Sequence, residues 1–433
     1  MIVPFWMKKV KLQMAGIVEF WRKKTYTGEE IPEGGRAGKN RPPLFGRSTM
    51  KHGRIWAAVL ACALLFTGCA GGGDTSANAP STPMEEAFAG RDMTLSVRLM
   101  AVGDNLIHDV IYQQAAARGS GGYHDFGPVY RQIAPIVAKA DIAVINQEVP
   151  VASDLYPLSS YPAFNSPKEL AGQVEGLGFN VVSYANNHMY DKGSAGLAES
   201  KRVFDALPSV TVAGIYERGS YDDIPIREEN GIRFAFLSYM EMTNVGSSGD
   251  TCGIYLKDEE TIRRQMELAR QQADFIVVNV HWGAEGSDTP NAYQKEEAQK
   301  LADWGADLIL GHHPHVLQPI AELTAADGRQ VPVIYSLGNF VSAQKGNYNM
   351  AGGFLDCTVV LDMKTGETRV EGLSFIPTVT QFGSRFSNLH IVPFADWSES
   401  QAAAHGLAGN GFSYQFVKRQ LENTFGNYLK TGA

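Results

Sequence analysis

Side chains that can bind metal ions or transfer protons follow a series of short apolar runs in this chain. A single histidine in such a position is more often a hydrogen-bonded structural residue than a metal ligand. Here six of the ten histidines share the placement, and a purely structural core does not readily account for so many polar groups. The groups are Gly103-Asp104-Asn105, His108-Asp109, Asn146-Gln147-Glu148, Asn186-Asn187-His188 with Asp191, His281-Trp282-Gly283 with Glu285, Gly311-His312-His313-Pro314-His315 and Ser336-Leu337-Gly338-Asn339-Phe340.

The apolar runs predict strands, and amphipathic segments between them predict helices. Strands are expected at residues 95–102, 142–145, 181–184, 210–213, 234–237, 275–280, 308–310 and 333–335, and helices at 194–206, 258–272, 292–304 and 414–429. This alternation indicates an α/β sandwich with parallel strands. A β-hairpin is expected from residues 353–362 and 368–375, so the sheets should be mixed.

The polar groups are expected to meet in space, because functional side chains in open α/β sheets lie just beyond the carboxyl ends of the strands. Imidazole and carboxylate ligands together suit Zn, Mn or Fe. His313 and His315 flank Pro314, and this loop spacing lets both rings turn towards one ion. The sequence therefore predicts a divalent-metal site.

The motifs, in this order from about residue 95 to residue 375, resemble those of the bacterial CapA-type poly-γ-glutamate capsule biosynthesis proteins. The resemblance implies a four-layer α/β/β/α sandwich of mixed sheets, related to the calcineurin-like metallophosphoesterases. It implies that His188 acts as general acid. It also implies a centre of one or two ions with ligands at Asp104, Glu148, Asn187, His281, His313 and His315.

Other residues near these motifs are candidates for substrate contact. Glu285 is a candidate acid–base residue, although it also suits the anchoring of a loop. The candidate pocket residues are Asn105, Asn146, Trp282 and Asn339, of which Trp282 also suits a core position and Asn339 a turn.

The chain departs from the calcineurin-like pattern at three places. No histidine lies two positions after Asp104, and Asn146-Gln147-Glu148 replaces the usual Gly-Asp of the second site. His312 is an additional histidine directly after Gly311. The number of ions is therefore left open.

The first 93 residues are expected to carry targeting information. Residues 55–66 are apolar and too short to span a bilayer, which is typical of a signal peptide. Phe66-Thr67-Gly68-Cys69 resembles a bacterial lipoprotein cleavage site, with a plain signal anchor as the alternative. We expect an upstream extension at 1–49, a lipoprotein signal peptide at 50–68, lipidation of Cys69 and a flexible tether at 69–93. The folded domain should follow at 94–393, and a helical tail at 394–433.

Charge excludes one class of partner. Residues 69–433 hold 26 basic and 42 acidic side chains, a net charge of −16, so nucleic acid is not an expected partner. No phosphate-binding loop, serine-nucleophile elbow or dinucleotide fingerprint occurs in a suitable context. Cys252 and Cys357 remain for the folded part, and the sequence leaves a disulfide between them open.

Two functions fit these observations. The first is a membrane-anchored, extracytoplasmic hydrolase that uses one or two divalent ions to cleave a phosphoester or the γ-amide links of a polyglutamate. The alternative is a non-catalytic accessory subunit that binds the anionic polymer, or helps its synthase to export or anchor it. Lys192, Lys201 and Arg202 are candidate polymer contacts, although a solvated helix face explains them equally simply.

Overall fold

The computed structural model describes residues 93–246 and 249–430. The expected extension at 1–49, the signal peptide at 50–68, the lipidation site Cys69 and all of the tether except Met93 lie outside the described residues. Within the described part, no helix is both long enough and apolar enough to cross a membrane.

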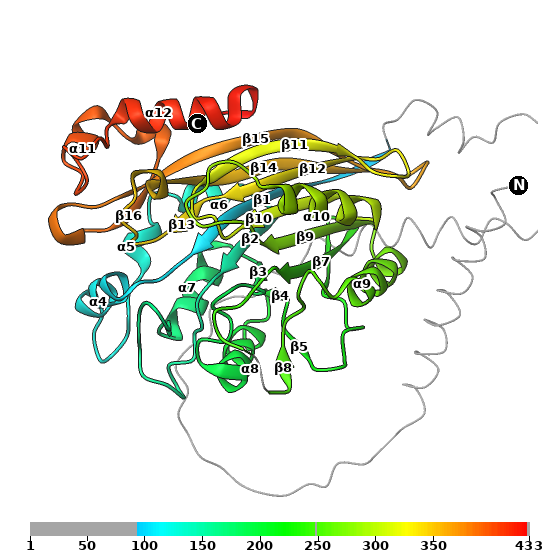
Figure 1. The fold of residues 1–433 in the computed structure, drawn as a ribbon, viewed down its shortest axis with the longest axis horizontal. Helices are drawn as coiled ribbons and strands as arrows, with labels where there is room; N and C mark the ends of the chain where they lie inside the picture. Colours follow the sequence, from blue (N-terminus) through cyan, green and yellow to red (C-terminus); the bar gives the residue numbers. More distant parts are fainter. Residues whose placement is uncertain (1–92, 247–248, 431–433) are drawn as a thin grey trace, which may run out of the picture. The chain divides into compact units, whose positions relative to one another are not determined.

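One mixed sheet contains the first predicted strand at its centre (Figure 1). Its order is β16-β15-β14-β1-β2-β3-β4, and β13 pairs with the end of β1. The strands from β1 to β4 are parallel, whereas β14, β15 and β16 are antiparallel. The bounds are β1 Thr94–Asn105, β2 Ile142–Gln147, β3 Val181–Ser183, β4 Thr211–Ala213, β13 Asn339–Val341, β14 Ala351–Asp362, β15 Thr368–Gln381 and β16 His390–Pro393.

A second mixed sheet has the order β11-β12-β10-β9-β7-β6. Its four inner strands are parallel, and antiparallel strands close both edges. The bounds are β6 Ile226–Glu229, β7 Ile232–Met240, β9 Phe275–His281, β10 Leu308–His312, β11 Leu317–Thr324 and β12 Gln330–Leu337, with a separate two-stranded pair of β5 Tyr216–Glu217 and β8 Thr251–Cys252.

The second sheet separates two hydrophobic cores. In β9, Phe275 and Val277 pack into the core that also contains β1, whereas Ile276 and Val278 pack into the core beneath α9 and α10. This alternation follows from the two-residue period of a strand. Helices α7 and α8 contribute to the first core, so the order of layers is helix, sheet, sheet, helix. The four-layer architecture of mixed sheets is confirmed.

The helices agree with the sequence where a long amphipathic pattern exists. Three expected helices end within one residue of α8, α9 and α10, whereas α4 and α7 were not expected. The tail contains α11 as well as α12, and α12 ends earlier than the pattern predicts. The bounds are α4 Asp109–Arg118, α5 Gly127–Tyr130, α6 Ala134–Val137, α7 Glu169–Leu177, α8 Gly193–Asp205, α9 Glu259–Gln272, α10 Ala292–Asp303, α11 Glu399–Ala403 and α12 Tyr414–Phe425.

Cys252 and Cys357 are both buried and do not form a disulfide. Cys252 lies in the short strand β8, and Cys357 lies in β14. The fold is therefore held by packing and hydrogen bonds in the part of the chain that the structure describes.

The end of β1 lies unusually close to the segment between β12 and β13. The backbone N–H of Asp104 donates to the carbonyl of Gly338 over 3.0 Å. A Cβ atom at Gly103 would lie 1.9 Å from that same carbonyl oxygen, which is part of the backbone and cannot move aside cheaply. Glycine at position 103 thus allows the approach that fixes Asp104.

We predict that Gly103→Ala destabilises the fold by roughly 1–3 kcal/mol, because the new methyl group forces the two backbones apart. Gly172→Ala is the matched control, since Gly172 lies in helix α7 and a Cβ there would meet nothing within 4 Å. That control should gain about 0.5–1 kcal/mol from the higher helix propensity of alanine. Urea unfolding measures both changes, and equal stability of the two variants would contradict the prediction.

Candidate metal centre

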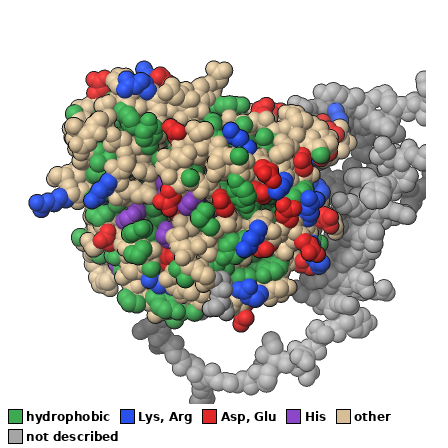
Figure 2. Space-filling model, viewed as in Figure 1, with side chains coloured by type: hydrophobic (Ala, Val, Ile, Leu, Met, Phe, Trp, Pro, Cys, Tyr) green, Lys and Arg blue, Asp and Glu red, His purple; other side chains and the backbone are tan. Residues whose placement is uncertain are grey.

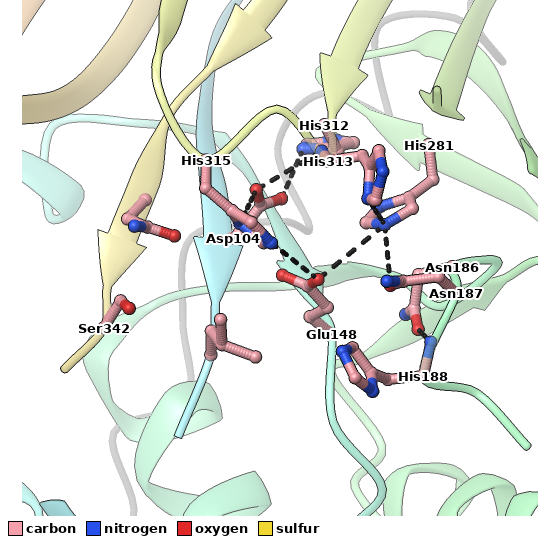
Figure 3. A network of polar contacts seen from close by, with 12 residues as sticks. Asp104, Glu148, Asn186, Asn187, His188, His281, His312, His313, His315 and Ser342 are labelled. Carbon is pink, nitrogen blue, oxygen red and sulfur yellow. Dashed lines mark hydrogen bonds and ion pairs between the residues drawn. The ribbon is translucent and has the colours of Figure 1, made fainter. Parts of the chain in front are cut away.

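The parallel strands of both sheets bring their carboxyl ends to one place (Figure 3). Asp104 at the end of β1 pairs in register with Asn146 at the end of β2. In the second sheet, His281 at the end of β9 pairs with His312 at the end of β10. The sheets face each other, so both sets of side chains point into a shared space.

Asp104 is fully buried and surrounded by donors. Its Oδ1 accepts a hydrogen bond of 2.8 Å from the carboxamide of Asn146. His315 Nδ1 lies 3.0 Å from Asp104 Oδ2, and His312 Nδ1 lies 3.6 Å from Oδ1. Although the distance to His315 is short, the ring nitrogen is not aligned for a hydrogen bond. Asp104 and His315 are therefore arranged more like two ligands of one metal ion than like a hydrogen-bonded donor and acceptor.

Glu148 is fully buried, and neither of its carboxylate oxygens accepts a hydrogen bond from a described residue. Its Oε1 lies 3.5 Å from His315 Nε2 and 3.7 Å from His281 Nε2. A carboxylate removed from water without partners is strongly unfavourable, and such groups are normally paired or bound to a metal. Because no hydrogen bond from a described residue satisfies its carboxylate, Glu148 fits a cation ligand.

His281, His313 and Asn187 are the other potential metal ligands near Glu148. His281 Nε2 lies 2.9 Å from Asn187 Oδ1 and 3.0 Å from His313 Nδ1. Three overlapping sets of potential ligands result, each with its ligand atoms within 4.8 Å of one another. The sets are Glu148, His281 and His313; Asp104, Glu148 and His315; and Glu285, His313 and His315.

Burial keeps most histidines of the cluster in the neutral form. Burial, aided by His313 and the other nearby histidines, lowers the pKa of His281 well below its ordinary value. Burial also lowers the pKa of His312 and of His313 to about 4. These imidazoles are therefore neutral at pH 7, and the neutral ring is the form that binds metals.

The pKa values of His315 and Glu148 are raised instead. Burial disfavours the charged ring of His315, but Glu148 and Asp104 overcome this and raise its pKa to about 9. Burial raises the pKa of Glu148 well above the ordinary value. Burial opposes ionisation of Asp104 too, yet His315 and His312 keep its pKa lowered. His315, Glu148 and Asp104 together thus retain a proton at neutral pH, and a bound cation would displace this proton.

The backbone at the Gly-His-His-Pro-His motif is strained. His313 has φ of 95° and His315 has φ of 59°, in the left-handed region that side chains other than glycine seldom occupy. Non-glycine residues in this region cost free energy and cluster at functional sites. Here the conformation turns both rings into the same cluster, as the spacing around Pro314 predicts.

His188 lies beside Glu148 (Figure 3) and is oriented by a buried acid. Its Nδ1 lies 2.8 Å from Oδ2 of Asp191, whose side chain is fully buried. The same oxygen accepts a hydrogen bond from the backbone N–H of Phe164, and the Phe164 ring contacts His188 edge-on with centroids 4.7 Å apart. Asp191 therefore fixes both the ring and the loop that covers it.

The remaining predicted residues divide between support and core. Asn146 binds Asp104, whereas the Asn105 side chain is satisfied by Gln147 and Tyr130 on the other side of the strand. Asn339 donates to Gln344, and its Oδ1 is buried without a partner among the described residues. Glu285 is exposed on its loop but lies within reach of His313 and His315.

Trp282 does not join the cluster. It is buried in the core beneath α9 and α10, where its Nε1 donates to the Tyr335 carbonyl over 3.0 Å. Neighbouring residues of a strand point to opposite faces, so the position that brings His281 to the site sends Trp282 away from it. Its placement favours the core interpretation over the predicted pocket role.

Lys192, Lys201 and Arg202 are held by their own chain. Lys201 pairs with Asp205 at 2.6 Å, and Arg202 pairs with Glu199 at 2.5 Å. Lys192 donates to the carbonyl of Ala163. These contacts favour the interpretation as an ordinary helix surface.

Two contributors were absent from the predicted set. His312 lies next to Asp104, and its other nitrogen lies 3.4 Å from Asn279 Oδ1. Asn244 lies 3.4 Å from the His188 ring, and its backbone N–H donates to the Asn187 carbonyl. The double histidine of the motif was a usable signal for His312. Asn244 carried none, because its loop reaches the site only in the folded chain.

His108 provides a test of the electrostatics that avoids the predicted ligands. Burial lowers its pKa to about 4, whereas a histidine in the unfolded chain titrates near 6.5. Between these values the unfolded state binds more protons, so stability falls as the pH drops from about 6.5 towards 4. We predict that His108→Gln weakens this dependence by up to about 1.4 kcal/mol per pH unit.

The measurement is urea unfolding of both proteins with a metal chelator at pH 6.5 and pH 5. Identical losses of stability in wild type and variant would show that His108 is not held neutral in the fold.

Known proteins resemble this chain over the part that contains the cluster. The model of the family described as "Bacterial capsule synthesis protein PGA_cap" matches residues 98–344. The PGA biosynthesis protein CapA of Bacillus subtilis (strain 168) is 30% identical over 221 residues, which cover 50% of this chain and 57% of that protein. The capsule biosynthesis protein CapA of Bacillus anthracis is 30% identical over 228 residues, which cover 50% of this chain and 54% of that protein. The matches thus span little more than half of each relative.

A solved structure, described as a novel phosphatase from Mycoplasma pneumoniae, aligns over 66% of this chain and 95% of that chain. The identity is 12% and the TM-score is 0.39, a likeness too loose to support an inference.

The residues that match the family model run from β1 to the loop after β13, and they include every strand end that contributes to the cluster. The chain therefore belongs to the bacterial capsule synthesis protein family PGA_cap.

Proposed function

We propose that this protein is a metal-dependent hydrolase of poly-γ-glutamate or related exopolymer biosynthesis, anchored outside the cytoplasmic membrane by a lipid on Cys69. Membership of the capsule synthesis family supports the biological role. The observation that carries the chemistry is the buried Glu148 carboxylate, which lacks a hydrogen-bond donor and faces His281 and His315.

Asp104, Glu148, Asn187, His281, His313 and His315 would hold the metal, with His312 and Glu285 adjacent. Zn, Mn or Fe suits this mixture of nitrogen and oxygen ligands. Two of the three ligand sets share Glu148, which is compatible with one ion or with two neighbouring ions. When bound, a divalent ion supplies Lewis-acid polarisation of a phosphoryl or acyl oxygen and a more acidic water.

The chain itself supplies the proton transfer. His188 has Nδ1 directed at Asp191, so Nε2, which lies 3.4 Å from Asn244 Nδ2, is the ring nitrogen that a substrate could meet. A proton on Nε2 would pass to the leaving oxygen or nitrogen of a phosphoester or γ-amide as the bond breaks. Membrane-bound synthase or export subunits are the proposed partners.

The first test measures metal content in the purified protein and in the double variant His313→Ala/His315→Ala. Wild type should contain stoichiometric metal, and the double variant should contain none, because both substitutions remove ligands from overlapping sets. Metal in hundred-fold excess over its dissociation constant should raise the stability of wild type by about 2.7 kcal/mol.

His390→Ala is the matched control, because His390 lies in β16 and its ring contacts the carbonyl of Asn388 and no ligand of the cluster among the described residues. Wild type without metal, even after reloading with Mn or Zn, would refute the catalytic proposal. Bound metal without turnover of phosphodiester or γ-glutamyl substrates would favour the accessory role in polymer binding or export.

His188→Gln separates acid catalysis from metal binding. The variant should retain its metal, because His188 belongs to none of the ligand sets. Its kcat should fall by roughly 10²- to 10⁴-fold, the usual contribution of a positioned acid. Steady-state kinetics and metal analysis on the same sample provide the check. An unchanged kcat would assign the ring a purely structural role.

A further inference from the structure

Apolar side chains are exposed around the metal cluster. Seven large apolar side chains are exposed among the described residues, and four of them lie on loops, or on the short 3-10 helix Asn347–Met350, that contact the cluster. These four are Tyr161, Met242, Val245 and Tyr348, and we call them the apolar rim. Figure 2 shows histidines in a group on one face, with apolar and acidic side chains close by. Exposed apolar groups that gather at one place usually mark a binding surface.

On one side, the rim is connected to His188. Tyr161, which is 77% exposed, contacts Phe164 with ring centroids 6.5 Å apart, and Phe164 packs against the His188 ring. Met242 and Val245 flank Asn244, which contacts both His188 and the Asn187 carbonyl. The rim residues therefore lie one to three positions from groups that touch the cluster.

On the other side, the rim is connected to His315. The carboxamide of Asn349 donates to the His315 carbonyl over 3.0 Å, and Tyr348 precedes Asn349 directly. The Tyr348 ring packs edge-on against Phe416 of α12, with centroids 5.0 Å apart. The C-terminal helix thus supports this part of the rim through Phe416.

The loop that carries Met242 and Val245 does not suit a long polyanion, although Lys345 lies three positions before Tyr348 in another part of the rim. Residues 241–250 contain Glu241 and Asp250 and neither lysine nor arginine. A polar, metal-binding floor bordered by exposed aromatic and aliphatic side chains instead matches a molecule with one polar head and an apolar body.

We propose that the substrate is amphiphilic: a phosphoester whose phosphate head lies at the metal cluster and whose long apolar substituent lies along the rim. This inference rests on the proposed metal-dependent function and selects, between phosphoester and γ-amide substrates, a phosphoester of an apolar alcohol. The apolar contact adds affinity because each methylene group that leaves water on binding contributes favourably.

The test is calorimetric binding of octyl phosphate and ethyl phosphate to the metal-loaded full chain, below the concentration at which octyl phosphate forms micelles. We expect octyl phosphate to bind at least ten-fold more tightly. The variant Tyr161→Ser/Met242→Ser should bind both compounds with the affinity of wild type for ethyl phosphate. Both side chains are exposed, so folding should be retained.

Tyr123→Ser/Met363→Ser is the matched control, because these residues are also exposed but lie in a loop after α4 and in the β14–β15 turn. It should keep the ten-fold difference. Equal affinity of wild type for the two phosphates would overturn the amphiphilic substrate while leaving the hydrolase proposal intact. Equal affinity, with rim-dependent sedimentation on phosphatidylcholine vesicles, would instead make the rim a membrane contact. Failure of both phosphates to bind the metal-loaded protein would overturn this inference together with the phosphoester interpretation of the function.

Discussion

The burial of Glu148 is the constraint on which the arrangement of the site depends. A carboxylate without hydrogen-bond donors in the interior is far from its preferred hydrated state, and only positive charge nearby offsets that cost. Three histidines and a second carboxylate lie around it, drawn from both sheets. Most of these imidazoles are held neutral by their own burial, so the positive charge must come from a shared proton or from a cation. A cation at the proposed metal site would take the place of that proton.

The fold positions this cluster of buried polar side chains where the strands of the two sheets end. Parallel strands deliver their carboxyl ends to one edge, and the face-to-face packing of the sheets brings two such edges together. Gly103 lets β1 approach the segment between β12 and β13, and the strained backbone at His313 and His315 turns two rings inward. The large apolar cores on either side of the second sheet stabilise the fold enough to offset this local backbone strain.

The same geometry suggests how the site meets its surroundings. His188 is fixed by Asp191 from within, and Phe164 connects it outward to the exposed Tyr161. The polar cluster and the apolar rim then lie within one continuous set of contacts. For a protein that we propose to be anchored at a membrane surface, such a rim suits substrates that are themselves partly apolar.

The sequence by itself determined the motifs, the family and the alternation of strands and helices, because each depends on residue types at short spacing. It also placed His281, His313, His315, Asp104 and Glu148 correctly as neighbours, since parallel strand ends must converge. It did not separate His281 from Trp282 or Asp104 from Asn105, although neighbouring residues on a strand face opposite ways and only packing decides which face meets the site. The tertiary structure alone decided the strands β6, β11 and β16, the contact of Asn244 with His188 and the apolar rim. They arise from contacts between segments far apart in the chain, and local sequence patterns do not predict such contacts.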